Sequence, residues 1–229
     1  MELRKDRERI SRMFGEIAPV YDRLNTIFSL NIDALWRKTV AQRSVRPADR
    51  IILDIACGSG ALTQALIRQA NPKAIVFGAD FCRPLLDRAH QHLPGNTFLH
   101  ADGLELPVAS ESVDLVTIAF GLRNMQDPHA GLREMYRVLK PGGRLAILEF
   151  TKANNAALQL AHGVYQNHIL PRIGDAVSGT KAYSYLNNSI EGWPEAPELA
   201  RWVRRSGFRL VRYSWLQMRN AALHIGEKP

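Results

Sequence analysis

The stretch Asp54-Ile55-Ala56-Cys57-Gly58-Ser59-Gly60 is the most informative part of this chain. It follows the apolar run of residues 51–53, and the next apolar run along the chain ends at Asp80. An apolar strand that leads into a glycine turn lets the backbone approach a ligand that a Cβ atom would exclude. A carboxylate at the tip of the following strand suits a ribose diol. The arrangement predicts a site for a nucleotide-type cofactor.

The glycine spacing distinguishes between cofactors. A dinucleotide-binding turn has Gly or Ala at the position that Thr63 occupies here. S-adenosylmethionine has no pyrophosphate to place at a helix N-terminus, so two glycines preceded by an acid suit it better. We therefore expect Gly58 and Gly60 to contact this cofactor, with Asp54 facing its amino group. The alternative is a glycine-bearing turn that binds no ligand.

The composition indicates an ordinary globular protein. The chain has 229 residues, of which 46% are hydrophobic and 23% are charged. No apolar run approaches the roughly 20 residues of a membrane-spanning helix, and residues 1–9 are charged rather than signal-like. We expect a soluble protein of the cytoplasm.

The net charge of +8 allows three interpretations. Basic residues gather in the first dozen residues and again between Arg201 and Arg212. Neither group is a dense basic run with interleaved aromatic residues, which argues against a nucleic-acid partner. Solvated helix faces explain most of these charges, and attraction to an anionic membrane surface comes second.

Cysteines and histidines give no sign of a metal site or a disulfide framework. Cys57 and Cys82 each follow an apolar strand-like run and lack the spacing of metal ligands. The histidines form no H-x-x-x-H pair on a credible helix. We therefore expect no metal.

Strand-like and helix-like segments alternate through the middle of the chain, which predicts a doubly wound α/β sheet. The expected parallel strands are 51–55, 74–80, 97–101, 113–120 and 144–150, with helices at 62–69, 84–92 and 128–139. A helix at 195–206, ended by Gly207, precedes an antiparallel hairpin at 208–217 and 221–227. This order resembles the class I S-adenosylmethionine-dependent methyltransferases, with a Rossmann-like sheet of seven strands, parallel except for an antiparallel closing strand.

Two segments lie outside this core in what we expect to be a single domain, 1–229. Residues 1–46 form an N-terminal helical cap, in which Ile10, Met13, Phe14 and Ile17 have amphipathic helical spacing. Residues 151–194 form a helical lid insertion between the cofactor-binding core, 47–150, and the C-terminal helix and hairpin, 195–229. The aromatic residues of the insertion are Tyr165, His168, Tyr183, Tyr185 and Trp193. Both segments are expected to cover the carboxyl ends of the strands, where such sheets bind ligands; the alternative is that they only cap the core.

Two further strand ends carry polar residues. Asp102, after the third strand, is expected to accept the adenine amino group, with Gly103 letting the base lie close. Arg123 and Asn124 follow the fourth strand at the topological switch point, where a methyl acceptor would lie. Their donors suit a phenolate or quinone oxygen. The alternative for Arg123 is a structural ion pair. The Asn/Asp-Pro-Pro-aromatic sequence of enzymes that methylate amide nitrogens is absent here.

At this point the chain resembles the C-methyltransferases of menaquinone and ubiquinone biosynthesis, the UbiE/MenG family, over nearly its whole length. The matching stretches are Met13-Phe14, Tyr21-Asp22-Arg23-Leu24-Asn25, Trp36-Arg37-Lys38, Ala119-Phe120-Gly121-Leu122-Arg123-Asn124, residues 137–144, Leu148-Glu149-Phe150, residues 170–174, Tyr185-Leu186, Ser189-Ile190 and residues 222–226. The Tyr-Asp, Phe-Gly-Leu-Arg-Asn and Leu-Glu-Phe pieces together are specific. The chain departs from the family pattern at Ala61, Ala119 and Asp33.

The resemblance implies S-adenosylmethionine as cofactor and a polyprenyl quinol as substrate. It places cofactor contacts at Ser59, Asp80, Phe81, Asp102, Gly103 and Ala119. The methyl group would pass to a ring carbon of demethylmenaquinol, or of a 2-methoxy-6-polyprenyl-1,4-benzoquinol, or of both. The prenyl tail predicts peripheral contact with the inner face of the membrane, which basic surface charge would assist. The resemblance leaves open whether the protein forms a homodimer.

In this interpretation Arg123 and Asn124 orient the ring and stabilise its oxygen. Tyr21 and Asp22 lie on the N-terminal lid near the ring, and His224 is a candidate proton relay. Asp22 is equally suited to cap a helix, and His224 equally suited to be a buried strand residue. The rival functions are methylation of another small phenol or polyketide, a cofactor-binding module without turnover, and RNA modification.

Overall fold

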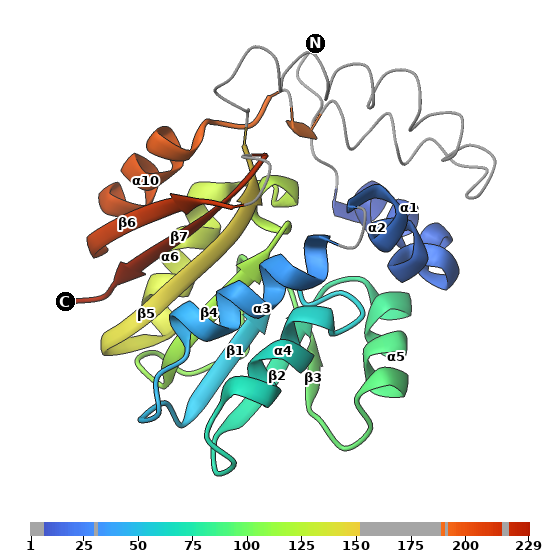
Figure 1. Cartoon of the computed structure of the whole chain (residues 1–229), viewed down its shortest axis with the longest axis horizontal. Helices are drawn as coiled ribbons and strands as arrows, with labels where there is room; N and C mark the ends of the chain where they lie inside the picture. Colours follow the sequence, from blue (N-terminus) through green and yellow to red (C-terminus); the bar gives the residue numbers. More distant parts are fainter. Residues whose placement is uncertain (1–6, 30–31, 152–188, 191, 217–219) are drawn as a thin grey trace.

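The apolar runs of the sequence assemble into one seven-stranded sheet with the order β3-β2-β1-β4-β5-β7-β6 (Figure 1). The computed structural model describes residues 7–29, 32–151, 189–190, 192–216 and 220–229. Its strands are β1 (Ile51–Ile55), β2 (Ile75–Asp80), β3 (Phe98–His100), β4 (Val113–Ala119), β5 (Leu139–Phe150), β6 (Arg209–Trp215) and β7 (Ala221–Glu227).

The strand directions confirm the predicted topology. The pairs β1–β2, β2–β3, β1–β4 and β4–β5 are parallel, whereas β7 is antiparallel to both β5 and β6. From β1 the chain adds β2 and then β3 on one side of the sheet, and it then returns to add β4 on the other side of β1. The order of strands therefore reverses between the neighbours β1 and β4. Open α/β sheets bind ligands at the carboxyl ends of the strands beside such a reversal.

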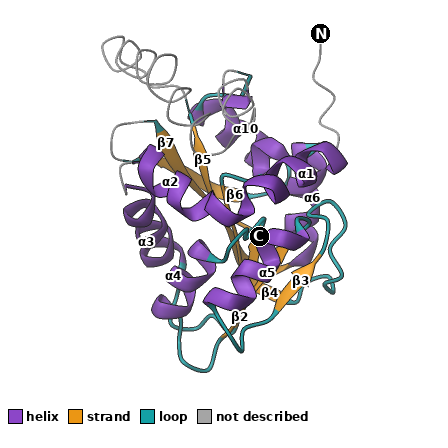
Figure 2. Cartoon of the chain, turned by 90° about the vertical axis from the view of Figure 1, so that its right-hand side faces the viewer, coloured by secondary structure: helices purple, strands orange, loops and turns teal. Residues whose placement is uncertain are grey.

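Helices cover both faces of the sheet (Figures 1 and 2). One face packs on residues of α3 and α4, and the opposite face packs on residues of α6 and α10. The helical elements are α1 (Arg7–Ile17), η1 (Ala18–Val20), α2 (Tyr21–Ser29), α3 (Ile32–Ser44), α4 (Ala61–Gln69), α5 (Arg83–His92), η2 (Leu122–Asn124), α6 (Pro128–Val138) and α10 (Ala196–Arg205). Burial of each strand from both sides explains why the parallel strands have near-continuous apolar sequences.

Local signals set the ends of two helices. Asp127 caps α6, because its carboxylate accepts a hydrogen bond of 3.0 Å from the backbone N–H of Ala130, and Pro128 occupies the first turn. Gly207 follows α10 with a φ of +103°, a left-handed conformation that suits glycine. Both ends had been predicted from the sequence.

The largest difference from the predicted strands is at β5. Residues 140–143 were expected to separate a helix from a strand that starts at Arg144, but β5 begins at Leu139. Leu139 pairs with Val113 of β4 across a register shift, and this contact extends the strand through the Pro-Gly-Gly segment. Tertiary pairing therefore overrides the local breaking signal.

The N-terminal cap contains more elements than the one amphipathic helix predicted. Pro19 lies in the 3-10 segment η1, and the chain resumes as α2 at Tyr21. The predicted apolar side of α1 is confirmed at Ile10 and Ile17, which are buried. Beyond η1, Tyr21 packs in a small apolar cluster that includes Cys82 and Leu85, so the cap rests on the start of α5.

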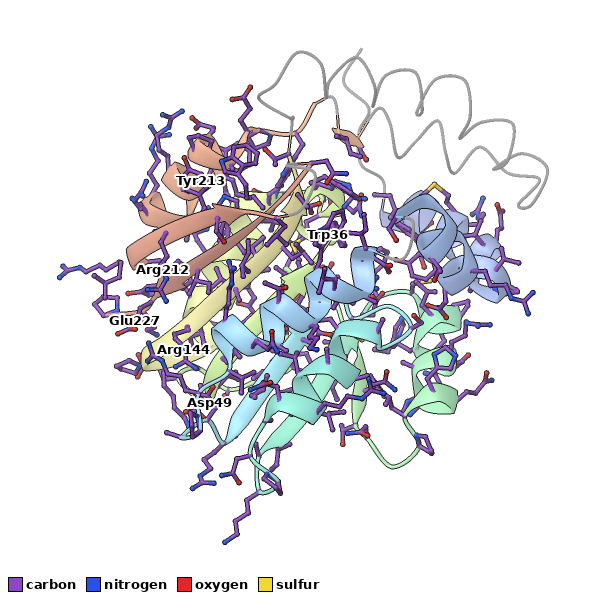
Figure 3. The ribbon with its side chains drawn as sticks, viewed as in Figure 1. Trp36, Asp49, Arg144, Arg212, Tyr213 and Glu227 are labelled. Carbon is purple, nitrogen blue, oxygen red and sulfur yellow. The ribbon has the colours of Figure 1, made fainter. Side chains whose placement is uncertain are left out.

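Two contacts hold α3 against the sheet (Figure 3). Arg144 of β5 forms a buried ion pair with Asp49, just after α3, with a nitrogen–oxygen distance of 2.6 Å. Trp36 of α3 packs against Phe120 and Phe150, with ring centroids 5.9 and 6.4 Å away. These contacts join α3 and the loop after it to the middle and the carboxyl end of β5.

Most of the predicted lid lies outside the described residues, including Tyr165, His168, Tyr183 and Tyr185. Trp193 is described and is buried, with its ring 5.7 Å from Trp202 of α10 in an edge-to-face arrangement. It therefore belongs to the core beside α10. Within the described part of the chain, no helix combines the length and apolar character needed to cross a membrane.

Candidate functional site

A cleft opens at the carboxyl ends of β1 to β4, where the topology predicts a ligand. About 510 Å³ in and around it is not filled by protein atoms, a volume that includes space open to solvent. Its lining residues are Ile55, Ala56, Ala79, Asp80, Phe81, Ala101, Asp102, Gly103, Leu104, Gly121, Asn124, Met125 and Gln126. Five of the predicted site residues therefore converge here: Asp80, Phe81, Asp102, Gly103 and Asn124.

Asp80, the last residue of β2, holds the glycine turn in place. Its Oδ2 accepts a hydrogen bond from the backbone N–H of Gly58, and its Oδ1 accepts one from Cys82, both at 2.8 Å. Burial raises the pKa of Asp80, and these backbone donors oppose that rise. Each oxygen keeps a further lone pair, so the carboxylate is able to accept the hydroxyls of a ribose while it shapes the turn.

Asp102 and Gly103 form the wall of the cleft after β3. Asp102 accepts a hydrogen bond of 3.0 Å from the backbone N–H of Leu104, which folds the chain into a tight turn. A Cβ atom on Gly103 would lie 2.6 Å from the terminal carbon of Met125 and 3.2 Å from Cγ2 of Ile55. Since both neighbours line the cleft, glycine keeps this wall open enough for a flat group such as a purine.

The glycine turn is left-handed at Gly58 and Gly60, whose φ angles are +54° and +85°. Gly60 is the N-cap of α4, and Ser59 between them is buried. The N-terminal cap covers this turn from outside. A Cβ atom on Gly58 would lie 3.7 Å from the ring of Tyr21, and the Ser59 hydroxyl donates a 2.5 Å hydrogen bond to the carboxylate of Asp22. The structure thus brings Tyr21 and Asp22 to the predicted cofactor turn.

Asp54 lies beneath the turn. Its oxygens accept hydrogen bonds from Thr63 at 2.7 Å and Thr117 at 2.8 Å, and the residue is 1% exposed. Burial raises the pKa of Asp54 to about 6, against the effect of both threonine donors. Asp54 is not among the residues that line the cleft; it joins β1 to α4 and β4.

Arg123 and Asn124 lie in η2, directly after β4. Arg123 Nη1 donates to Glu149 at 2.8 Å and to the carbonyl oxygen of Phe120 at 2.6 Å, while its Nε donates to Ser189 at 3.3 Å. Asn124 donates to the same Phe120 carbonyl at 3.1 Å and lines the cleft. The structural ion pair that the sequence left open for Arg123 therefore exists.

Glu149 is the site residue that sequence reasoning missed. It stood in a quoted motif, but no role was given to it. The side chain is fully buried and bonds Arg123 through both its guanidinium and its backbone N–H. An acidic residue directly after the apolar run of residues 145–148 was the available signal, because a buried charge needs a partner.

Ala119 and His224 are two further predicted site residues that do not line the cleft. Ala119 packs on the side of the sheet that faces Trp36. His224 of β7 is buried, with Nε2 2.9 Å from the carbonyl oxygen of Ala196 and its ring stacked on Tyr213. Burial lowers the pKa of His224 to about 4, so the ring is neutral at physiological pH. The structure thus places His224 as a buried strand residue, the alternative that the sequence had left open.

The chemistry of the site favours binding and orientation over covalent catalysis. Burial raises the pKa of the Cys57 thiol well above its usual value, which leaves it protonated and unreactive. Among the described residues, no group of three or more His, Cys, Asp and Glu side chains is arranged to hold a metal ion. Carboxylates at the tips of β2 and β3 and a left-handed glycine turn fit an adenosine-bearing cofactor.

Comparison with known proteins agrees with this geometry. The model of the ubiE/COQ5 methyltransferase family matches residues 1–228. The demethylmenaquinone methyltransferase of Clavibacter sepedonicus is 39% identical over 100% of this chain and 94% of its own length. That of Thermus thermophilus is 41% identical over 95% of this chain and 100% of its own length. A solved SAM-dependent methyltransferase of Thermotoga maritima has the same fold, with a TM-score of 0.68 and 17% identity over 95% of this chain and 99% of that one.

Proposed function

This chain belongs to the ubiE/COQ5 methyltransferase family, and from that premise we propose that it methylates a ring carbon of demethylmenaquinol. The names of the relatives from Clavibacter sepedonicus and Thermus thermophilus support this substrate. The chain is an S-adenosylmethionine-dependent C-methyltransferase. The observation that carries the proposal is the cleft itself. Its lining combines the carboxylate residues at the ends of β2 and β3, which suit a nucleoside cofactor, with the loop after β4.

Cofactor binding is assigned to the residues of the cleft and the glycine turn. Asp80 would accept the ribose hydroxyls, and Asp102 would accept the adenine amino group beside Gly103. Gly58 to Gly60 would pass beneath the amino-acid end. When bound, S-adenosylmethionine would supply an electrophilic methyl group on its sulfonium sulfur, for transfer to the ring carbon of the acceptor.

The residues after β4 would orient the acceptor. An electron-rich quinol ring has to lie in line with the carbon–sulfur bond, and its oxygen carries negative charge once its hydroxyl has ionised. Asn124, on the cleft wall, offers an amide to that oxygen. Arg123 contributes positive charge from its pair with Glu149. A guanidinium keeps its proton in proteins, so Arg123 stabilises charge and does not remove the ring proton.

The acceptor's prenyl tail would remain in the bilayer while the ring enters the cleft. We propose peripheral contact with the inner face of the membrane from the cytoplasm, assisted by the net charge of +8. Sedimentation with anionic and neutral vesicles at low salt tests this contact: binding to the anionic vesicles alone is expected, and absence of binding would contradict it. Light scattering of the purified chain gives its molar mass in solution and so tests whether it forms a homodimer.

The deciding experiment is a methyl-transfer assay with purified protein. We expect methylated product, identified by mass spectrometry, from demethylmenaquinol and less from a tailless phenol. The methoxy-benzoquinol serves as a third acceptor and reports ring specificity. Arg123→Ala should abolish most of the activity, whereas Arg133→Ala, which removes an exposed arginine of α6, should not. Preference for the tailless phenol would overturn the proposed substrate class.

A further inference from the structure

The amino-acid end of the cofactor needs polar partners that the predicted site does not supply. This end carries an ammonium group and a carboxylate, and charged groups of this kind require partners of opposite charge when they are withdrawn from water. Asp54 was expected to meet the ammonium group. Its oxygens are engaged by Thr63 and Thr117 beneath the turn, however, and the residue is fully buried there.

The N-terminal cap places another carboxylate on the same turn from above. Asp22, in the first turn of α2, accepts the hydrogen bond from Ser59 through Oδ1. Its Oδ2 has only longer contacts, 3.4 Å to Nη2 of Arg88 and 4.0 Å to Nδ1 of His92. The Asp22 side chain is 35% exposed. It therefore differs from Asp54 in having an oxygen that is accessible and only weakly engaged.

Arg88 of α5 supplies the complementary charge. Its Nε atom is buried and has no hydrogen-bond partner among the described residues. A buried donor that lacks an acceptor costs free energy, and an arginine presents its N–H groups in a fork that matches a carboxylate. A ligand carboxylate placed here would satisfy that donor.

We propose that Asp22 and Arg88 bind the amino-acid end of S-adenosylmethionine, an assignment that rests on the proposed function. Asp22 receives the ammonium group and Arg88 receives the carboxylate. The cap is then part of the cofactor site, and docking of α2 on the glycine turn completes that site. The weak Asp22–Arg88 contact of 3.4 Å keeps each charge partnered before the ligand arrives.

Ligands that differ at this end test the assignment, and calorimetric binding needs no methyl acceptor. S-adenosylhomocysteine carries both charged groups and 5′-methylthioadenosine carries neither. Decarboxylated S-adenosylmethionine keeps the ammonium group and lacks the carboxylate, and it also carries the sulfonium methyl group, so each variant is compared with the unmodified chain for the same ligand. We expect Asp22→Asn to weaken S-adenosylhomocysteine by about tenfold or more, the size of a lost charged hydrogen bond. Its affinity for 5′-methylthioadenosine should stay within about twofold, which also shows that the variant is folded. Arg88→Gln should weaken S-adenosylhomocysteine but not the decarboxylated ligand.

Two further variants separate direct binding of the cofactor from an indirect effect on how α2 and α5 dock on the glycine turn. Asp87→Asn removes a neighbouring carboxylate of α5 that pairs with Arg83 on the surface, and it should change no affinity. His92→Gln loosens the contact between α5 and the Ser59 carbonyl, at 3.2 Å, and leaves both charges in place. An effect of His92→Gln equal to that of Asp22→Asn, or an equal loss of all ligands in Asp22→Asn, would overturn the assignment. If the unmodified chain bound none of the three ligands, the proposed function would fail as well.

Discussion

The carboxylate of Glu149 and the guanidinium of Arg123 form a buried ion pair with a nitrogen–oxygen distance of 2.8 Å. Glu149 also accepts hydrogen bonds from the backbone N–H groups of Arg123, at 3.2 Å, and Phe150, at 2.9 Å. Because Glu149 is the last residue but one of β5 and Arg123 follows β4, this pair fixes the loop after β4 to the neighbouring strand. The same loop carries Asn124 on the cleft wall.

Glu149→Gln should lower the free energy of unfolding by about 3 kcal/mol, because it leaves a buried guanidinium without its counter-charge. Urea denaturation at neutral pH measures this change. The control Asp87→Asn breaks an exposed pair and should cost no more than about 1 kcal/mol. If the two variants lost equal stability, the buried pair would contribute no more than a surface one.

The double variant Glu149→Gln with Arg123→Gln separates stability from catalysis. Two neutral amides can hydrogen-bond each other, so we expect most of the stability lost in Glu149→Gln to return. Methyl transfer should stay low, because the positive charge beside the acceptor is gone. Recovery of turnover together with stability would show that Arg123 has only a structural role.

Gly121→Ala should impair both folding and cofactor binding. A Cβ atom on Gly121 would lie 2.4 Å from Cβ of Ala56 and 3.2 Å from the side chain of Ile118. Neither neighbour can swing aside, so the loops after β1 and β4 have to separate, at a cost of about 1–3 kcal/mol. Gly103→Ala is the comparison, since its closest clash is with the flexible end of Met125. Thermal unfolding should show the larger loss for Gly121→Ala, whereas both variants should weaken S-adenosylhomocysteine, because both glycines line the cleft.

The sequence predicted the sheet well because its strands are buried on both faces. The apolar runs at β1 and β7 match the observed strands. Leu139 was not assigned to a strand, because its pairing with Val113 depends on a contact that no local pattern records. The break at Pro19 was missed because of a local pattern: the apolar spacing of α1 continues into the next segment and conceals the break.

The sequence predicted which candidate residues meet where their positions follow from the ends of strands. It did not predict the pairings between side chains of different strands. Asp80, Asp102 and Asn124 meet in one cleft because the carboxyl ends of parallel strands share one edge. The direction in which Asp54 points depends on Thr117, which arrives from β4. The partnership of Glu149 with Arg123 likewise joins two separate strand ends. Neither pairing can be read from spacing along the chain.

Asp54 should make the protein less stable as the pH rises from about 4 to 6. Its pKa is about 6 in the folded state and 3.8 when unperturbed, so in this interval the folded state binds more protons than the unfolded state. The free energy of unfolding then falls with rising pH, by on the order of 3 kcal/mol, and is constant above about pH 7. The stability of Asp54→Asn minus that of the unmodified chain, from urea denaturation at several pH values, should rise over this interval. A flat difference would mean that Asp54 ionises normally.

His224 should act in the opposite direction over nearly the same interval. Its pKa is about 4 in the folded state and 6.5 when unperturbed, so the unfolded state binds the extra proton between these values. Its contribution is complete above about pH 6.5 and is lost as the pH falls toward 4, again on the order of 3 kcal/mol. In the unmodified chain the two slopes therefore largely cancel. His224→Gln, whose amide can still donate to Ala196, should expose the slope of Asp54, whereas Asp54→Asn should expose that of His224. The double variant should lose both slopes, and identical pH profiles for the two single variants would contradict this account.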